Sequence, residues 1–233
     1  MIPLRDSIKS TTFPYVTVSL VAINTLIFIF QITLNERQLI ILFNNLGVIP
    51  AIFTQFSIVQ ILLAGILPIG SLITSIFLHG SWLHLLGNMV YLWVFGDNVE
   101  DRLGHGGFFV FYLVAGVIGS LAHILANPMS SIPTIGASGS IAGILGAYLV
   151  FYPRAKVQAL IPLIVIFTVT RIRAVYFLFI WFFIQVLNGI TVMASGAQAV
   201  AWWAHIGGFL AGAIIAAYFK LGLPEGNPNL RPT

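Results

Sequence analysis

Long apolar runs, separated by short polar or charged connections, make up most of the chain. Six of these runs have the composition expected of membrane-spanning helices. They lie at about residues 14–34, 82–96, 107–126, 138–152, 174–190 and 199–219. The sequence therefore predicts an all-α, polytopic membrane protein built as a bundle of six transmembrane helices.

Two further apolar segments do not have the pattern of a clean span. Residues 35–70 are interrupted by charged or polar residues, glycines and prolines. These are Glu36, Arg37, Asn45, Gly47, Pro50, Gly65 and Pro68. This favours short helices in the outer interface of the bilayer. Residues 157–169 number only 13 and include Pro162, whereas a span needs about 20 residues. We expect a re-entrant or interfacial hairpin there, on the inner side.

The distribution of basic residues sets the expected orientation, because cytoplasmic segments carry an excess of Lys and Arg. With the N-terminus inside, nine of the ten Lys and Arg residues fall on inner segments. We expect a cytosolic tail at residues 1–13, a membrane domain at 14–220 and a second cytosolic tail at 221–233. Residues 1–13 are too polar to hold the apolar core of a signal peptide. The expected location is a prokaryotic plasma membrane.

The lengths of two predicted spans indicate a recess at the outer face. The runs at 82–96 and 138–152 hold 15 residues each, or about 22 Å of helix, against a hydrocarbon core of about 30 Å. If both helices reach the inner surface, their outer ends stop short of the outer one. Ser138 would then lie on the floor of a recess, and His205 would lie at a similar depth.

Composition narrows the possible chemistry. Charged residues make up 7% of the chain, hydrophobic residues 59%, and there is no cysteine. Disulfides, thiol chemistry and cysteine-based metal sites are therefore excluded. The net charge of +4 follows from the topology and does not indicate a nucleic-acid partner. We expect no cofactor and no metal, and the oligomeric state stays open.

Polar side chains inside membrane spans are functional candidates by default. Those singled out here are His84, Asn88, His123, Ser138, Ser140 and His205, with His79 just before the second span. All six acidic residues fall on the inner segments or the first outer loop, so a Ser-His-Asp triad is excluded. A Ser138–His205 dyad is not excluded, with His205 as general base. Asn88, His84 and the Ser138 N–H could donate to an oxyanion.

The same residues also have a simpler interpretation. Glycines line both helices, at Gly139, Gly143 and Gly146 in the fourth span and Gly208 and Gly212 in the last. They would let the helices approach as closely as a serine–histidine hydrogen bond requires, but packing alone also explains them. Ser138 could be only an N-cap, and His84 and Asn88 could be interhelical hydrogen-bonding residues.

Three motifs appear in order along the chain. They are His79…His84…Asn88 with Glu100-Asp101-Arg102-Leu103-Gly104, then Gly136-Ala137-Ser138-Gly139, then Ala204-His205-Ile206-Gly207-Gly208. Together they resemble the rhomboid family of intramembrane serine proteases, over about residues 74–212. The resemblance implies a lipid-embedded protease that hydrolyses peptide bonds in or near transmembrane segments of other membrane proteins.

The resemblance also assigns roles to individual residues. It makes Ser138 the nucleophile, His205 the base, and His84 and Asn88 the oxyanion helpers. Gly208 matches a glycine that lets the last span pack on the fourth. The remaining supporting positions are His79, which is structural or water-binding, and Gly136 and Gly139 beside the serine.

The chain departs from the family pattern at two places. The first outer loop has no Trp-Arg pair, and Ala142 stands where some members have a tyrosine that packs on the histidine. His205 must therefore be held by another group, such as Tyr148 or an aromatic residue of the fifth span. The aromatic residues of that span, mostly expected to face lipid, are Tyr176, Phe177, Phe179, Trp181, Phe182 and Phe183.

Two other functions stay open at this point. A catalytically inactive rhomboid-like protein could bind transmembrane helices without cleaving them. A transporter could use the histidines, although it would lack the membrane carboxylates that such pathways usually contain.

The expected topology can be tested with introduced cysteines, because the native chain has none. A cysteine at position 155 or 172 should react with a membrane-impermeant thiol reagent only from the cytosolic side. Labelling from the outer side alone would overturn the topology.

Overall fold

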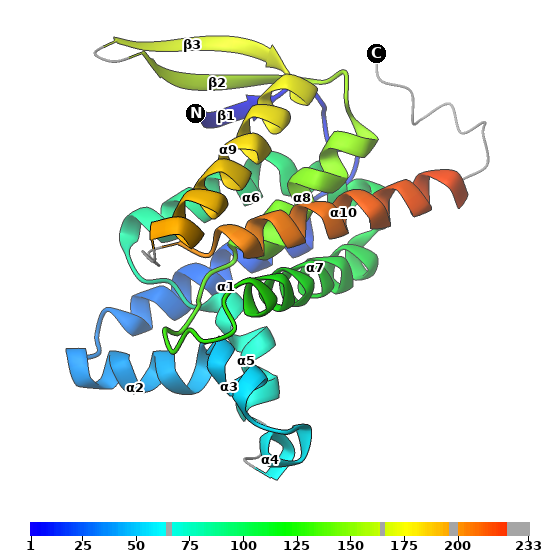
Figure 1. Cartoon of the computed structure of the whole chain (residues 1–233). Helices are drawn as coiled ribbons and strands as arrows, with labels where there is room; N and C mark the ends of the chain where they lie inside the picture. The colour runs from blue at the N-terminus through cyan, green and yellow to red at the C-terminus, as the bar shows by residue number, and fades with distance from the viewer. Residues whose placement is uncertain (64–66, 164–165, 196–199, 223–233) are drawn as a thin grey trace.

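The fold is mainly helical in the computed structural model, which describes residues 1–63, 67–163, 166–195 and 200–222 (Figure 1). A bundle contains six longer helices, namely α1 (Tyr15–Gln31), α6 (Trp82–Leu103), α7 (His105–Ala126), α8 (Ser138–Phe151), α9 (Ala174–Ser195) and α10 (Trp202–Gly222). Each coincides with one of the predicted runs. Helix α8 is central, because it contacts α6, α7, α9 and α10 and buries most of its residues.

Length and composition support a multi-pass membrane protein. Within the described parts of the chain, three segments are long and apolar enough to span a bilayer: His105–Ala126, Ala174–Thr191 and Trp202–Leu221. A fourth candidate is the pair Leu67–Phe77 and Trp82–Leu103, which is bent by 77°. Helices α1 and α8 are apolar but shorter, so these criteria give three or four spans where the sequence predicts six.

Helix α6 is longer than predicted. It continues through Asp97 and Glu100 to Leu103 and ends at Gly104, whose φ is 70°. The charged residues that follow the predicted run at 82–96 therefore belong to the helix, and the expectation of a second short helix is wrong. The sequence predicts that α6 and α8 are both short. Only α8 is short, with 14 residues.

The carboxylates near the end of α6 are paired with the N-terminal part of the chain. Glu100, which is 1% exposed, accepts hydrogen bonds from the N–H groups of Val16 and Thr17 at 2.9 and 2.8 Å. A carboxylate at the first turn of a helix satisfies free N–H groups there and favours the helix dipole. Asp101 accepts from Thr11 and Thr12. These contacts tie the end of α6 to the start of α1 and to the residues that precede it.

A three-stranded antiparallel sheet lies at one end of the bundle (Figure 1). Strands β2 (Lys156–Leu163) and β3 (Ile166–Arg173) form a hairpin, and β1 (Ile2–Asp6) pairs with the other edge of β2. The expectation of an all-α fold is therefore wrong, and the expected hairpin is a β-hairpin. Val157 and Ala159 alternate inward at full burial, which is the two-residue period of a half-buried strand.

Short helices lie in residues 36–63 and 67–77, and the sequence predicts short helices over residues 35–70. They are α2 (Glu36–Leu46), α3 (Pro50–Gln55), α4 (Ile58–Leu63), α5 (Leu67–Thr74) and the 3₁₀ helix η1 (Ser75–Phe77). Figure 1 shows them at the end of the bundle away from the sheet. An isolated β-bridge between Val48 and Thr134 joins this region to the loop that precedes α8. The short helices therefore help to place the start of α8.

Candidate active site

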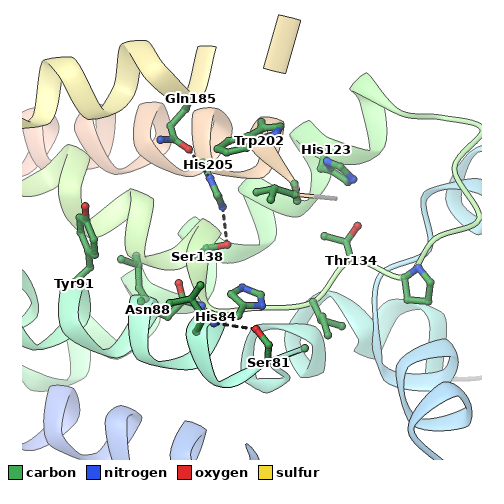
Figure 2. Close-up of a pocket in the computed structure, with 18 of the residues that line it drawn as sticks. Ser81, His84, Asn88, Tyr91, His123, Thr134, Ser138, Gln185, Trp202 and His205 are labelled. Atoms are coloured by element: carbon green, nitrogen blue, oxygen red, sulfur yellow. Dashed lines mark hydrogen bonds between the residues drawn. The ribbon is translucent and has the colours of Figure 1, made fainter. Parts of the chain in front are cut away.

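A cavity of about 710 Å³ opens at the end of the bundle where α8 begins (Figure 2). Its wall comes from α6, α9, α10, the ends of α7 and α8 that face them, and the loop before α8. The polar residues in this wall include Ser81, His84, Asn88, His123, Ser138, Gln185 and His205. The structure therefore brings five of the singled-out residues into one recess, namely His84, Asn88, His123, Ser138 and His205.

Ser138 and His205 are in direct contact in this recess. Ser138 is the first residue of α8, and its Oγ lies 2.8 Å from Nε2 of His205. Helix α10 begins at Trp202 rather than near residue 199, so His205 is in its first turn. His205 is 9% exposed and Ser138 is half-buried. The two first turns meet, and Ser138 remains accessible from the cavity.

Glycines allow this meeting, because they bring the backbones of α8 and α10 into contact. A Cβ added to Gly208 would overlap the carbonyl oxygen of Gly139, and one added to Gly212 would overlap that of Gly143. A Cβ on Gly146 would overlap the carbonyl oxygen of Phe209. Close approach through small residues is a general means of packing membrane helices. These distances fit the packing role expected for Gly208, which stays a prediction.

Gly136 shapes the loop that leads into α8. Its φ is 124°, a conformation that side chains rarely adopt, and a Cβ there would lie 2.6 Å from Nε2 of His84. Its N–H donates to the carbonyl of Ser75 at 2.8 Å. Only glycine fits at this point. The chain therefore passes directly over His84 before it reaches Ser138.

Helix α6 supplies two polar residues to the cavity. Ser81 is the N-cap of α6, and its side chain accepts a hydrogen bond from the His84 N–H at 3.2 Å. His84 and Asn88, one turn apart, both face the recess. The side-chain nitrogen Nδ2 of Asn88 lies 3.0 Å from Nε2 of His79. Asn88 is therefore held from behind by a buried histidine.

His79 is buried and is bonded to α1 through its backbone. It is 1% exposed, and Gln31 of α1 bonds both its carbonyl, at 2.9 Å, and its N–H, at 3.1 Å. It is not among the cavity-lining residues. These contacts fit the structural alternative for His79, which stays a prediction.

The second nitrogen of His205 has a partner that the sequence reasoning missed. Its Nδ1 lies 2.8 Å from Oε1 of Gln185 on α9. The His205 ring also contacts Trp181, with ring centroids 6.1 Å apart, and Trp202, with centroids 5.9 Å apart. An aromatic residue of the fifth predicted span, Trp181, therefore packs on His205, which is one of the two alternatives expected from the sequence. The other alternative is wrong, because the Tyr148 hydroxyl donates to Asp6.

Gln185 could have been found from the sequence. An amide in an otherwise apolar span satisfies the same criterion that selected Asn88. The sequence does not show which side of α9 faces the other helices. The position of Gln185 beside His205 could therefore not be predicted.

His123 lies in the last turn of α7 and lines the recess. Its Nδ1 is 3.3 Å from the side-chain nitrogen of Asn127, in the connection that follows. His123 therefore contacts the connection that follows α7. Within the described ranges of the chain, no group of three or more His, Asp or Glu side chains could hold a metal ion.

Comparison with protein families identifies the class. The model of the Rhomboid domain matches residues 69–221, which is more than half of the chain and contains every site residue described above. The chain belongs to the rhomboid family. The motif resemblance is thereby confirmed.

Individual relatives agree with this assignment. The chain is 45% identical to the Rhomboid protease GluP of Bacillus subtilis over 78 residues, 34% of this chain and 15% of that protein. It is 35% identical to the mitochondrial Rhomboid protein 1 of Saccharomyces cerevisiae over 91 residues, 37% and 26% of the two chains. It is 26% identical to Rhomboid-like protease 3 of Toxoplasma gondii over 186 residues, 80% and 60% of the two.

In each case the match covers less than two thirds of the relative's length. Because the relatives include mitochondrial and plant proteins, family membership does not select a prokaryotic plasma membrane. That location stays a prediction.

Replacing Gly208 should disturb the site through the backbone. In Gly208→Ala, the new Cβ would force α10 away from the Gly139 carbonyl and so separate His205 from Ser138. A displacement of ~1 Å can lower reactivity about a hundredfold. We expect slower labelling of Ser138 by a serine-directed fluorophosphonate and a lower melting temperature. Gly106→Ala is the control, because a Cβ there meets nothing within 4 Å. Equal behaviour of the two variants would contradict this account of the packing.

Proposed function

We propose that this chain is an intramembrane serine endopeptidase that cleaves membrane-protein substrates in or near their transmembrane segments. The observation that carries the proposal is the 2.8 Å contact between Ser138 Oγ and His205 Nε2 on the wall of an open cavity. Nucleophile and base within hydrogen-bond reach are the signature of an activated serine. Membership of a family that includes proteins named as proteases supports it.

In the proposed reaction, Ser138 Oγ attacks the carbonyl carbon of the scissile peptide bond while His205 Nε2 takes its proton. The C–N bond then breaks, and His205 gives that proton to the leaving amine. An acyl group remains as an ester on Ser138. Water, deprotonated by His205, attacks this ester and releases the second product, which restores both side chains.

The oxyanion that forms in each addition step would be stabilised from two sides. Ser138 begins α8, and the first N–H groups of a helix have no partners within it. Across the recess, Asn88 and His84 of α6 present donors from the opposite wall. Fixed donors of this kind stabilise developing negative charge without reorganisation. His79 supports the arrangement by contact with Asn88.

The proposed topology has all six bundle helices crossing the membrane, with both termini in the cytosol. Helix α8 has 14 residues, or about 21 Å, against a hydrocarbon core of about 30 Å. If its far end reaches the cytosolic surface, Ser138 lies below the outer surface. The recess above it would supply water to a depth where lipid would otherwise exclude it.

Removal of either dyad member should abolish proteolysis. Ser138→Ala lacks the nucleophile and His205→Ala lacks the base. The double variant should be no worse than either single one, because residues that act as a unit are non-additive. The measurement is cleavage of a model transmembrane substrate by purified variants. Substantial turnover by either single variant would disprove the dyad, and an intact substrate with the wild type would favour an inactive helix-binding protein.

Asn88→Ala should be a defect in rate rather than in folding. Loss of one oxyanion donor costs about 2.7–4 kcal/mol, or roughly a hundred- to thousandfold in rate. An interhelical hydrogen bond in a membrane averages only about 0.6 kcal/mol. Turnover and melting temperature are measured in the same detergent, with Asn45→Ala, an exposed asparagine, as the control. A variant that cleaves normally but melts many degrees lower would show that Asn88 only joins helices.

A further inference from the structure

Gln185 is a buried amide in a helix that otherwise presents mostly apolar side chains. It lies on α9, is 5% exposed, and points into the recess toward His205 (Figure 2). A buried amide needs partners for both its oxygen and its nitrogen. Both partners are present, and they lie on opposite sides of the amide group.

The two partners fix which end of the amide faces the histidine. The nitrogen Nε2 of Gln185 donates to the backbone carbonyl of Trp181 at 3.0 Å. The reversed amide would place its oxygen against that carbonyl, so that two acceptors would face each other. The oxygen Oε1 therefore faces His205 Nδ1, at 2.8 Å.

An amide oxygen can only accept a hydrogen bond, so Nδ1 of His205 must carry the proton of the neutral ring. The other nitrogen, Nε2, then has a free lone pair directed at the Ser138 hydroxyl, 2.8 Å away. We propose that Gln185 is the positioning residue that holds His205 in the tautomer able to accept the proton of Ser138. This inference rests on the proposed protease function and adds a third residue to the dyad.

The other neighbours of His205 cannot perform this selection. Trp181 and Trp202 contact the imidazole ring at interplanar angles of 31° and 82°. They restrict the ring plane and exclude water, but neither contact distinguishes a protonated from an unprotonated nitrogen. The selection requires a hydrogen-bond acceptor at Nδ1, the task that an aspartate performs in a serine-histidine-aspartate triad. Here a neutral amide takes that place.

The test compares three variants on α9. Gln185→Met keeps the length of the side chain and removes the acceptor. Gln185→Glu keeps an acceptor. Asn188→Met removes an amide one turn away that is not among the cavity-lining residues, and it serves as the control. All are assayed in one detergent for melting temperature, substrate turnover and the rate at which a fluorophosphonate labels Ser138.

Gln185→Met should lower kcat and the labelling rate about 5- to 100-fold, because a buried N–H loses its acceptor. KM should change little, since Gln185 acts through His205 rather than on the substrate. Gln185→Glu should recover most of the labelling rate. Its activity should need a more alkaline pH than that of the wild type, because a carboxylate favours the protonated ring. Asn188→Met should resemble the wild type.

The tautomer itself can be observed by ¹⁵N NMR of histidine-labelled protein, with His205→Ala to assign the signals. In the wild type, His205 should show a protonated Nδ1 and an unprotonated Nε2. In Gln185→Met, this preference should be reduced or lost. A residue that only packs would change the melting temperature without changing the tautomer.

The outcomes separate this inference from the proposed function. If the wild type cleaves substrate while Gln185→Met keeps the same tautomer and labelling rate, the role of Gln185 is wrong and the protease stands. If Gln185→Met and Gln185→Glu are equally impaired with an unchanged tautomer, Gln185 only packs. If the wild type neither cleaves nor labels, the proposed function fails, and the NMR result alone then decides the role of Gln185.

Discussion

Direct backbone contact between α8 and α10 is the constraint on which the candidate site depends. Lipid tails are as apolar as leucine, so helices in a membrane gain little from hydrophobic burial and associate through close packing. Here the Gly139 and Gly143 carbonyls occupy the space that side chains at positions 208 and 212 would need. This contact brings two helix starts together, so that a serine and a histidine 67 residues apart lie 2.8 Å from each other.

The opposite wall of the recess is held by a separate set of contacts that runs along α1. Glu100 bonds the N–H groups at the start of α1, and Gln31 at its end bonds the backbone of His79 on both sides. The ring of His79 then contacts Asn88. One helix thus links the paired carboxylates near the end of α6 to a polar residue in the recess. The proposed oxyanion donors are placed by polar contacts, and the proposed dyad by glycine packing.

Much of this arrangement could be predicted because it depends on local sequence patterns. Apolar run lengths located the bundle helices, and the rarity of polar groups in spans singled out His84, Asn88, Ser138 and His205. Features set by long-range contacts were missed. Strand β1 pairs with residues more than 150 positions away. The sequence of residues 1–13 alone therefore predicts only a tail. The predicted run at 82–96 stops before the carboxylates of α6, whose partners lie far away in the sequence, at residues 11–17. Gln185 meets His205 only because α9 turns that face toward α10.

The central claim is that Ser138 hydrolyses peptide bonds at the level of the membrane. The most direct measurement reconstitutes the purified protein in liposomes with a single-span substrate and maps the products by mass spectrometry. The account predicts two fragments whose new termini lie in or next to the substrate's transmembrane segment, and none with Ser138→Ala. Cleavage that persists in Ser138→Ala, or a substrate that the wild type binds and leaves intact, would contradict it.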